Sequence, residues 1–196
     1  MVFAAGNTVA RDNADNYAAA RQFLKDTLSS TPYYVIPGSK DIKGTGSLNN
    51  FRQSFGEDFK VLDIQGTRFI MLNMATGSWR SSNGEQWNQI KRALAEASTA
   101  PSINNVVVIN SLPIPNGVTL KTVSGISDAK EAEILRKMLV DFSEESGKPV
   151  AFISGQDGFR ADKLDGISYI SVGTDCPVIS INPGADQWIQ VLRNPR

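Results

Sequence analysis

The segment YYVIPGSKD (33–41) decides the fold, because it runs from a buried strand into a polar turn that contains glycine. Aromatic and β-branched residues followed by Pro-Gly are typical of a strand that ends in a turn. Three other segments repeat this arrangement: AAGNTVAR (4–11), INSLP (109–113) and ISGQDGF (153–159). In open α/β sheets, functional sites collect at the carboxyl ends of strands, so the four turns are expected to converge.

The spacing of apolar residues predicts strands that alternate with helices, followed by strands in succession. This order indicates an α/β fold with mixed sheets. Gly66 separates two of the runs, which predicts an antiparallel pair there. The expected strands are 2–5, 33–38, 59–64, 68–73, 104–110, 150–154, 167–172, 178–181 and 188–192.

Three helices are expected, each from a capping residue followed by apolar residues at helical spacing. The signals are Asn13 before 14–28, Asn83 with Gln86 before a helix that carries Trp87 and Leu94, and Asp128 with Glu131 before a helix that Gly147 ends.

Composition excludes several classes of protein. The 196 residues include no histidine and a single cysteine, Cys176, which rules out an internal disulfide and removes the commonest zinc ligand and general base. The 20 basic and 20 acidic residues cancel, so bulk charge favours neither nucleic acid nor an anionic membrane. No apolar run approaches the roughly 18 residues that a bilayer span requires. The sequence specifies no compartment.

The order and spacing of the four turns resemble calcineurin-like metallophosphoesterases, in which the motifs GDxxDR, GNHD, GH and GHxH follow successive strands. The likeness covers nearly the whole chain and implies a sandwich of two mixed β-sheets flanked by helices. In that family the turns hold two metal ions that activate a water for attack on phosphorus. A DxH strand comes first in the family, whereas this sequence begins at the second strand. The resemblance therefore implies that the single domain 1–196 lacks its first strand and is a fragment of a larger protein.

At the positions that match the family's ligands, this sequence has residues that bind metal ions poorly. The aspartates of the first turn correspond to Asn7 and Ala10, and the Asn-His pair of GNHD corresponds to Ser39 and Lys40. The histidines of the later turns correspond to Ser111, Gln156 and Gly158. Asp41 is retained, but in the family this residue orients a histidine. The resemblance thus predicts a chain without catalytic residues, bound metal or cofactor.

The resulting interpretation is a catalytically inactive metallophosphoesterase-like domain that acts as a binding or structural module. One alternative is a metal-dependent phosphoester hydrolase whose site is rebuilt from Asp12, Asp41 or Asp157, or is completed by a partner. Metal content separates the two.

A further alternative is a metal-free phosphate or anion site at Arg11, Lys40 and Arg160, where positive charge and turn amides could hold phosphate. For partners, we expect another polypeptide segment or a second copy to complete the sheet beside 2–5, because unpaired strand edges invite pairing. Neither nucleic acid nor membrane insertion is expected.

Overall fold

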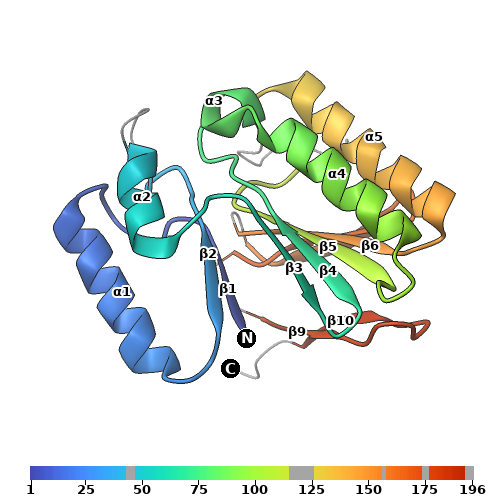
Figure 1. The fold of residues 1–196 in the computed structure, drawn as a ribbon, viewed down its shortest axis with the longest axis horizontal. Coiled ribbons are helices and arrows are strands. Elements are labelled where there is room, and N and C mark those ends of the chain that lie inside the picture. The colour runs from blue at the N-terminus through green and yellow to red at the C-terminus, as the bar shows by residue number, and fades with distance from the viewer. Residues whose placement is uncertain (43–46, 115–125, 156–157, 174–176, 193–196) are drawn as a thin grey trace.

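The computed structural model describes residues 1–42, 47–114, 126–155, 158–173 and 177–192. A six-stranded mixed sheet lies at its centre, in the order β3-β4-β5-β6-β8-β7 (Figure 1). The four inner strands run parallel to one another, and the edge strands β3 and β7 are antiparallel to their neighbours. These strands are β3 (Lys60–Ile64), β4 (Thr67–Met71), β5 (Asn105–Asn110), β6 (Val150–Ser154), β7 (Arg160–Leu164) and β8 (Ile167–Ser171).

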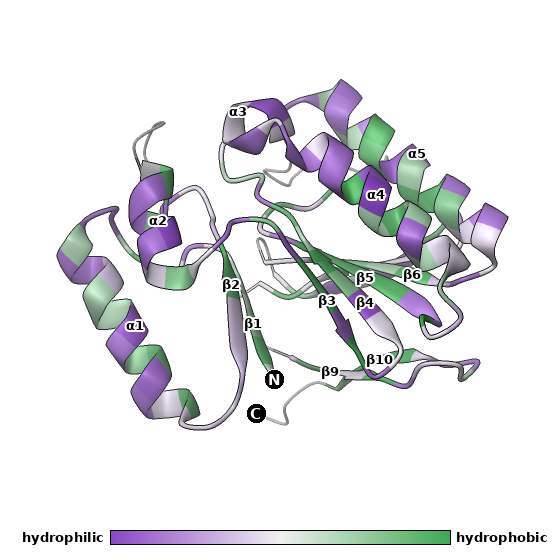
Figure 2. Cartoon of the chain, in the orientation of Figure 1, coloured by the Kyte–Doolittle hydropathy of each residue, from purple (hydrophilic) through white to green (hydrophobic). Residues whose placement is uncertain are grey.

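Two helices cover one face of this sheet, as Figure 1 shows for α4 and α5. Hydrophobic and hydrophilic residues alternate along both helices, while β5 and β6 are mostly hydrophobic (Figure 2). Leu94 and Leu135 on the helices are buried against Val108 and Phe152 on the strands. Each fully buried side chain of this size contributes about 1.5–3 kcal/mol, so this layer supplies much of the stability. The helices of the fold are α1 (Ala14–Leu28), α2 (Ser47–Phe55), α3 (Trp79–Asn83), α4 (Gln86–Thr99) and α5 (Ala129–Ser146).

Two small sheets pack against the opposite face of the central sheet. One is the parallel pair β1 (Val2–Ala5) and β2 (Tyr33–Ile36), and the other is the antiparallel pair β9 (Val178–Ile181) and β10 (Ile189–Leu192). The Phe3 ring stacks on Phe69 of the central sheet, with 4.9 Å between ring centroids. The predicted second sheet is thus present as two separate pairs within the described residues.

The outer face of the β1–β2 pair is covered by α1 and α2. Tyr17 of α1 and Phe51 of α2 are buried against Val35, while the alternate residue Ile36 faces the central sheet. This two-residue alternation places β1 and β2 between the two helices and the central sheet. The turns that follow β1 and β2 therefore lie at the junction of the layers.

The predicted strands and the three predicted helices are present, with shifts of one or two residues at several ends. Asn13 caps α1 by accepting from the amide of Asn16, and Asp128 caps α5 by accepting from that of Glu131. Gly147 ends α5 in the left-handed conformation, with φ 68°. Sequence reasoning missed α2, α3 and β7.

The predicted capping box at Asn83 and Gln86 is wrong. The N-cap of α4 is Glu85, whose side chain makes no capping bond. Asn83 belongs to α3, and its side-chain amide nitrogen donates to the carboxylate of Asp58 at 3.2 Å. The side-chain oxygen of Asn83 accepts from the backbone amide of Glu85 at 3.2 Å, which lies before the first residue of α4.

Candidate functional site

Turns that follow strands of different sheets meet at one junction, as their spacing predicted. A Cβ added at Gly6, after β1, would lie 2.6 Å from Cβ of Ser111, after β5, and 2.9 Å from Cα of Gly38, after β2. A Cβ added at Gly155, after β6, would lie 1.9 Å from the carbonyl oxygen of Ala5. Only residues without a side chain allow such close approach of backbone to backbone. The junction is therefore tightly packed at these contacts.

Asp41 ties the turn after β1 to the turn after β2. Its carboxylate is fully buried and accepts from the amide of Val9 at 2.7 Å and from that of Gly38 at 2.8 Å. The backbone of Gly6 and Asn7, with φ 89° and 56°, curls the first turn so that successive amides face this carboxylate. Burial raises the pKa of Asp41, while the backbone amides of Val9, Gly38, Thr8 and Asn7 act in the opposite direction.

Two further contacts complete this connection. The side-chain oxygen of Asn7 accepts from the amide of Lys40 at 3.0 Å. The hydroxyl of Tyr17 donates to the carbonyl oxygen of Asp41, and burial followed by the charge of Asp41 raises the pKa of this tyrosine. The retained aspartate thus connects α1 with both turns.

The other positions that correspond to metal ligands are dispersed or inert. Ser39 and Lys40 are exposed. Ser111 is buried, its amide donates to the side chain of Asn110 at 2.7 Å, and its hydroxyl has no hydrogen-bond partner among the described residues. Gly158 has an exposed backbone, and Gln156 lies outside the described residues.

The side chains proposed for an anion site give no evidence of a built pocket. Arg11, Lys40 and Arg160 are all exposed. Among the described residues, none of their side chains makes an ion pair or hydrogen bond with the four turns. Arg160 opens the edge strand β7 and pairs in register with Ser171.

The donor set at the junction does not fit a two-metal centre. Such a centre needs several carboxylates and imidazoles, because two divalent ions about 3.5–4 Å apart repel each other. The chain has no histidine, and both oxygens of the Asp41 carboxylate accept from backbone amides. Within the part of the chain that the structure describes, no three His, Cys, Asp or Glu side chains form a group able to hold a metal ion.

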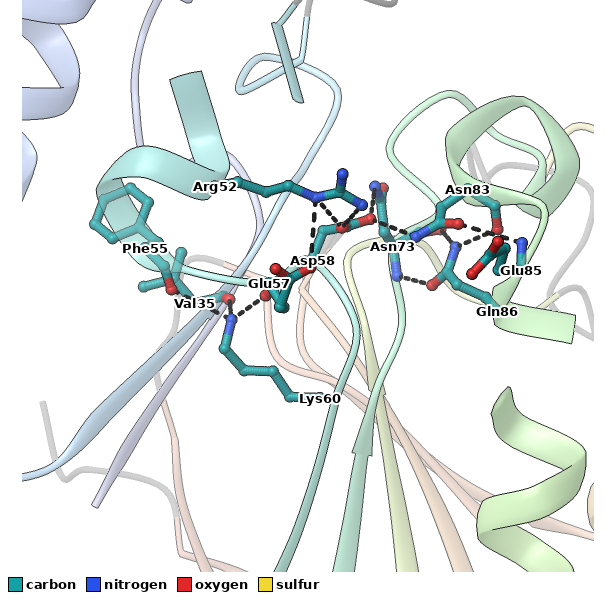
Figure 3. Close-up of polar contacts among 10 residues, drawn as sticks. All are labelled: Val35, Arg52, Phe55, Glu57, Asp58, Lys60, Asn73, Asn83, Glu85 and Gln86. Atoms are coloured by element: carbon teal, nitrogen blue, oxygen red, sulfur yellow. Dashed lines mark hydrogen bonds and ion pairs between the residues drawn. The ribbon is translucent and has the colours of Figure 1, made fainter. Parts of the chain in front are cut away.

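A second polar cluster, which sequence reasoning did not find, centres on Asp58 (Figure 3). This carboxylate is fully buried and accepts from the guanidinium of Arg52 of α2 at 2.6 Å. It also accepts from the side-chain amide of Asn73 at 2.9 Å and from the side-chain amide of Asn83 at 3.2 Å. The side-chain oxygen of Gln86 accepts from the backbone amide of Asn73 at 2.6 Å, and its side-chain nitrogen donates to the backbone carbonyl of Asn73 at 2.7 Å. The cluster connects α2, α3 and α4 with the end of β4.

Lys60 lies on the α2 side of this cluster (Figure 3). Its ammonium donates to the carbonyl oxygens of Val35 at 3.4 Å, Phe55 at 3.3 Å and Glu57. Burial lowers the pKa of Lys60, while the charges of Asp58 and Glu57 raise it. The ammonium of Lys60 thus connects the end of α2 with β2. The polar groups of the cluster are paired with one another, so the cluster is a structural connection.

Comparison with known proteins identifies the fold. No protein-family model matches the chain, and no curated protein matches it in sequence. Among solved structures, the chain is similar to GAP50, the anchor in the inner membrane complex of Plasmodium. That likeness has a TM-score of 0.60 at 14% identity, over 98% of this chain and 67% of GAP50.

It is also similar to phosphopantetheinyl hydrolase (PptH) from Mycobacterium tuberculosis, with a TM-score of 0.50 at 14% identity, over 97% of this chain and 84% of that enzyme. Both proteins have the calcineurin-like metallophosphoesterase fold. The chain therefore has a metallophosphoesterase-like α/β fold over nearly its whole length, as the turn motifs implied.

Proposed function

We propose that this chain is a catalytically inactive metallophosphoesterase-like domain that acts as a binding or structural module. One observation carries the proposal: within the part of the chain that the structure describes, no three His, Cys, Asp or Glu side chains come together to hold a metal ion.

The polar groups of the junction support the same conclusion. Asp41 is the one acidic residue retained there, and its oxygens are engaged by Val9 and Gly38. The oxygen of the Asn7 side chain is engaged by Lys40. Metal binding at Asp41 would have to break its two buried hydrogen bonds, and each amide left without an acceptor would cost about 1–3 kcal/mol.

The comparisons offer support for two different tasks. GAP50 is described as an anchor in a membrane complex, which suits a structural or binding task for this fold. PptH is described as a hydrolase, so the same fold also suits an enzyme. The residues of this chain favour the first task, because a hydrolase site rebuilt around Asp12 or Asp41 would lack imidazole and would reuse a carboxylate that already joins two turns. Asp157, the other candidate for such a site, lies outside the described residues.

The alternative of a metal-free anion site has less support. A phosphate bound at the curled turn after β1 would use its backbone amides. The carboxylate of Asp41 already accepts from Val9 in that turn, and a negative charge at this place repels an anion.

Metal content and hydrolysis test the proposal together. We expect the purified protein to retain no stoichiometric manganese, iron or zinc after dialysis, measured by elemental analysis. We also expect hydrolysis of bis-(p-nitrophenyl) phosphate to stay at background with or without added manganese, because no metal-activated water is available. An active metallophosphoesterase, dialysed and assayed in parallel, is the control. One equivalent of retained metal, or a clear rate that follows added manganese, would sink the proposal in favour of the hydrolase.

A further inference from the structure

The end of α3 places an asparagine directly before a glycine. Asn83 is the last residue of the helix, and Gly84 follows it with φ −63° and ψ −21°. Because glycine has no side chain, its amide nitrogen can approach the side-chain carbonyl carbon of the preceding residue without obstruction. Among the described residues, Asn83 is the only asparagine that precedes a glycine, and the other such pair, 116–117, lies outside them.

The amide nitrogen of Gly84 is available as a nucleophile. Gly84 is exposed, and its amide donates no hydrogen bond to any described residue. At the end of α5, by contrast, the amide of Gly147 donates to the carbonyl oxygen of Ser143 at 3.0 Å. An exposed amide without a hydrogen bond exchanges its proton with water readily. The deprotonated nitrogen, which is the form that attacks a carbonyl carbon, is therefore accessible at Gly84.

The side chain of Asn83 is folded back toward this nitrogen (Figure 3). Its carbonyl oxygen accepts from the backbone amide of Glu85, two residues further on, at 3.2 Å. This contact is an Asx turn, in which an asparagine side chain curls over the backbone that follows it. A donor on the carbonyl oxygen also stabilises the negative charge that develops there when a nucleophile adds to Cγ. The end of α3 thus combines a free nucleophile, a carbonyl carbon and a donor for the oxyanion.

We propose that Asn83 is a site of spontaneous deamidation in the folded protein, a reaction that is independent of the function proposed above. The amide nitrogen of Gly84 forms a bond to Cγ of Asn83, and the bond from Cγ to Nδ2 breaks. The amide proton of Gly84 leaves with Nδ2 as ammonia. Water then opens the cyclic imide at either of its carbonyl carbons and produces aspartate or isoaspartate at position 83. Water is the co-reactant, and no electrons are transferred.

The product brings a second carboxylate into the cluster around Asp58. In the unmodified protein, the side-chain nitrogen of Asn83 donates to Oδ2 of Asp58 at 3.2 Å, and Asp58 is fully buried. Deamidation replaces this donor with a negatively charged acceptor. Two carboxylates at such a distance repel each other, so one of them must take up a proton or move away. Deamidation therefore weakens the connection between α3 and the residues around Asp58.

Peptide mapping of the aged protein tests the reaction. The folded protein is incubated in mildly alkaline buffer and digested with trypsin, which releases residues 81–91 as one peptide. Mass spectrometry with fragmentation then locates any amide that has become a carboxyl group. We expect the change at Asn83 and not at Asn88, which is exposed in the same peptide but lies within α4 and precedes glutamine.

Gly84→Ala is the matched variant. A Cβ at this position has the carbonyl oxygen of Arg80 as its nearest neighbour, 3.9 Å away, and a φ of −63° suits alanine, so we expect the fold to be retained. The added methyl group obstructs the approach of the nitrogen to Cγ of Asn83. We expect deamidation at Asn83 to be at least about tenfold slower in this variant, which corresponds to about 1.4 kcal/mol of activation free energy.

Asn83→Asp tests the effect of the product on the Asp58 cluster. We expect this variant to unfold at a lower urea concentration than the wild type, and the difference to shrink as the pH falls and one carboxylate is protonated. Asn88→Asp is the control, because it introduces the same charge at an exposed position of the same segment. It should not lower the urea midpoint.

Three outcomes would overturn the proposal. The first is a folded protein in which Asn83 keeps its amide while the urea-unfolded protein loses it, because the fold then protects the site. The second is a Gly84→Ala variant that deamidates at Asn83 as fast as the wild type. The third is an Asn83→Asp variant with the same urea midpoint as Asn88→Asp, which would show that the product leaves the cluster intact.

Discussion

Asp41 is the residue on which the junction of the turns depends. Its carboxylate joins the amide of Val9, after β1, to the amide of Gly38, after β2. The sequence identified the position through its likeness to a motif, but assigned it no contact. The contact with Val9 spans 32 positions, so local sequence contained no signal for it, whereas the contact with Gly38 spans three.

We expect Asp41→Ala to lower the free energy of unfolding by roughly 2–6 kcal/mol, because two buried amide donors lose their acceptor at about 1–3 kcal/mol each. Urea denaturation followed by circular dichroism measures the change. Lys40→Ala is the matched control, since its side chain is exposed and such substitutions usually stay within about 0.5 kcal/mol. Equal losses in the two variants would contradict a connecting role for Asp41.

The pH dependence of stability shows whether burial or the backbone hydrogen bonds have the larger effect on the pKa of Asp41. Burial raises its pKa and backbone hydrogen bonds lower it, with burial the larger. A raised pKa means that the group's contribution to stability is fully present below the unfolded pKa of about 3.9 and is lost as the pH rises through the folded pKa. Asp41→Asn removes this titration. We therefore expect the free energy of unfolding of the wild type, relative to that of Asp41→Asn, to rise as the pH falls from about 7 toward about 4. A difference that shrinks in this window means that the amides outweigh burial.

At the scale of elements, the cluster around Asp58 connects the helices to the central sheet. Asp58 follows α2 and accepts from Arg52 of α2, from Asn73 after β4 and from Asn83 of α3. Loss of one partner from a buried pair leaves a charge or donor without compensation, which is costlier than loss of an exposed pair.

We expect Asp58→Ala to lower the free energy of unfolding by about 1–3 kcal/mol, because the side-chain amide of Asn73 loses its buried acceptor, whereas Arg52, whose side chain is 37% exposed, can return to water. The neighbouring acid supplies the control, because Glu57 also pairs with Arg52, at 3.6 Å, but its side chain is 77% exposed. Glu57→Ala should change stability by less than about 1 kcal/mol. Urea denaturation of both variants gives the comparison, and a mild Asp58→Ala variant would mean that water or rearranged side chains replace the carboxylate.

The elements that sequence reasoning missed are those whose signals are short or concealed by charge. Helix α3 has five residues, and the buried Glu131 of α5 accepts from the amide of Trp79 at its start, a contact across 52 positions. Strand β7 has the sequence RADKL, which lacks alternation of apolar and polar residues. A signal for β7 was nevertheless present: Asp165 and Gly166 have φ 50° and 78° and form the hairpin turn into β8. An Asp-Gly pair is among the strongest short-range indications of such a turn.

At the scale of the whole molecule, the sequence predicted the alternation of layers and the convergence of the turns, because both follow from periodicity and strand order. It did not predict how the layers meet. The contact of Gly155 with Ala5 joins β6 of the central sheet to β1 of the smaller layer. A glycine reads as a turn in sequence, whereas here its lack of a side chain lets two layers touch.

The contact at Gly155 leads to a prediction about the joining of the layers. Gly155 has no positive φ, so an alanine there is not strained by the backbone itself. Its Cβ would nevertheless lie 1.9 Å from the oxygen of Ala5, which is backbone and cannot rotate away. We expect Gly155→Ala to force β1 from the central sheet and to lower the free energy of unfolding by about 1–3 kcal/mol, the usual cost of overpacking. Gly84→Ala is the control, because its nearest atom is 3.9 Å away and its φ is −63°. That change should be neutral or stabilise by up to about 1 kcal/mol. Urea denaturation measures both. If Gly155→Ala is as stable as Gly84→Ala, the turn after β6 has room for a side chain, and the close contact between Gly155 and Ala5 does not join the two layers.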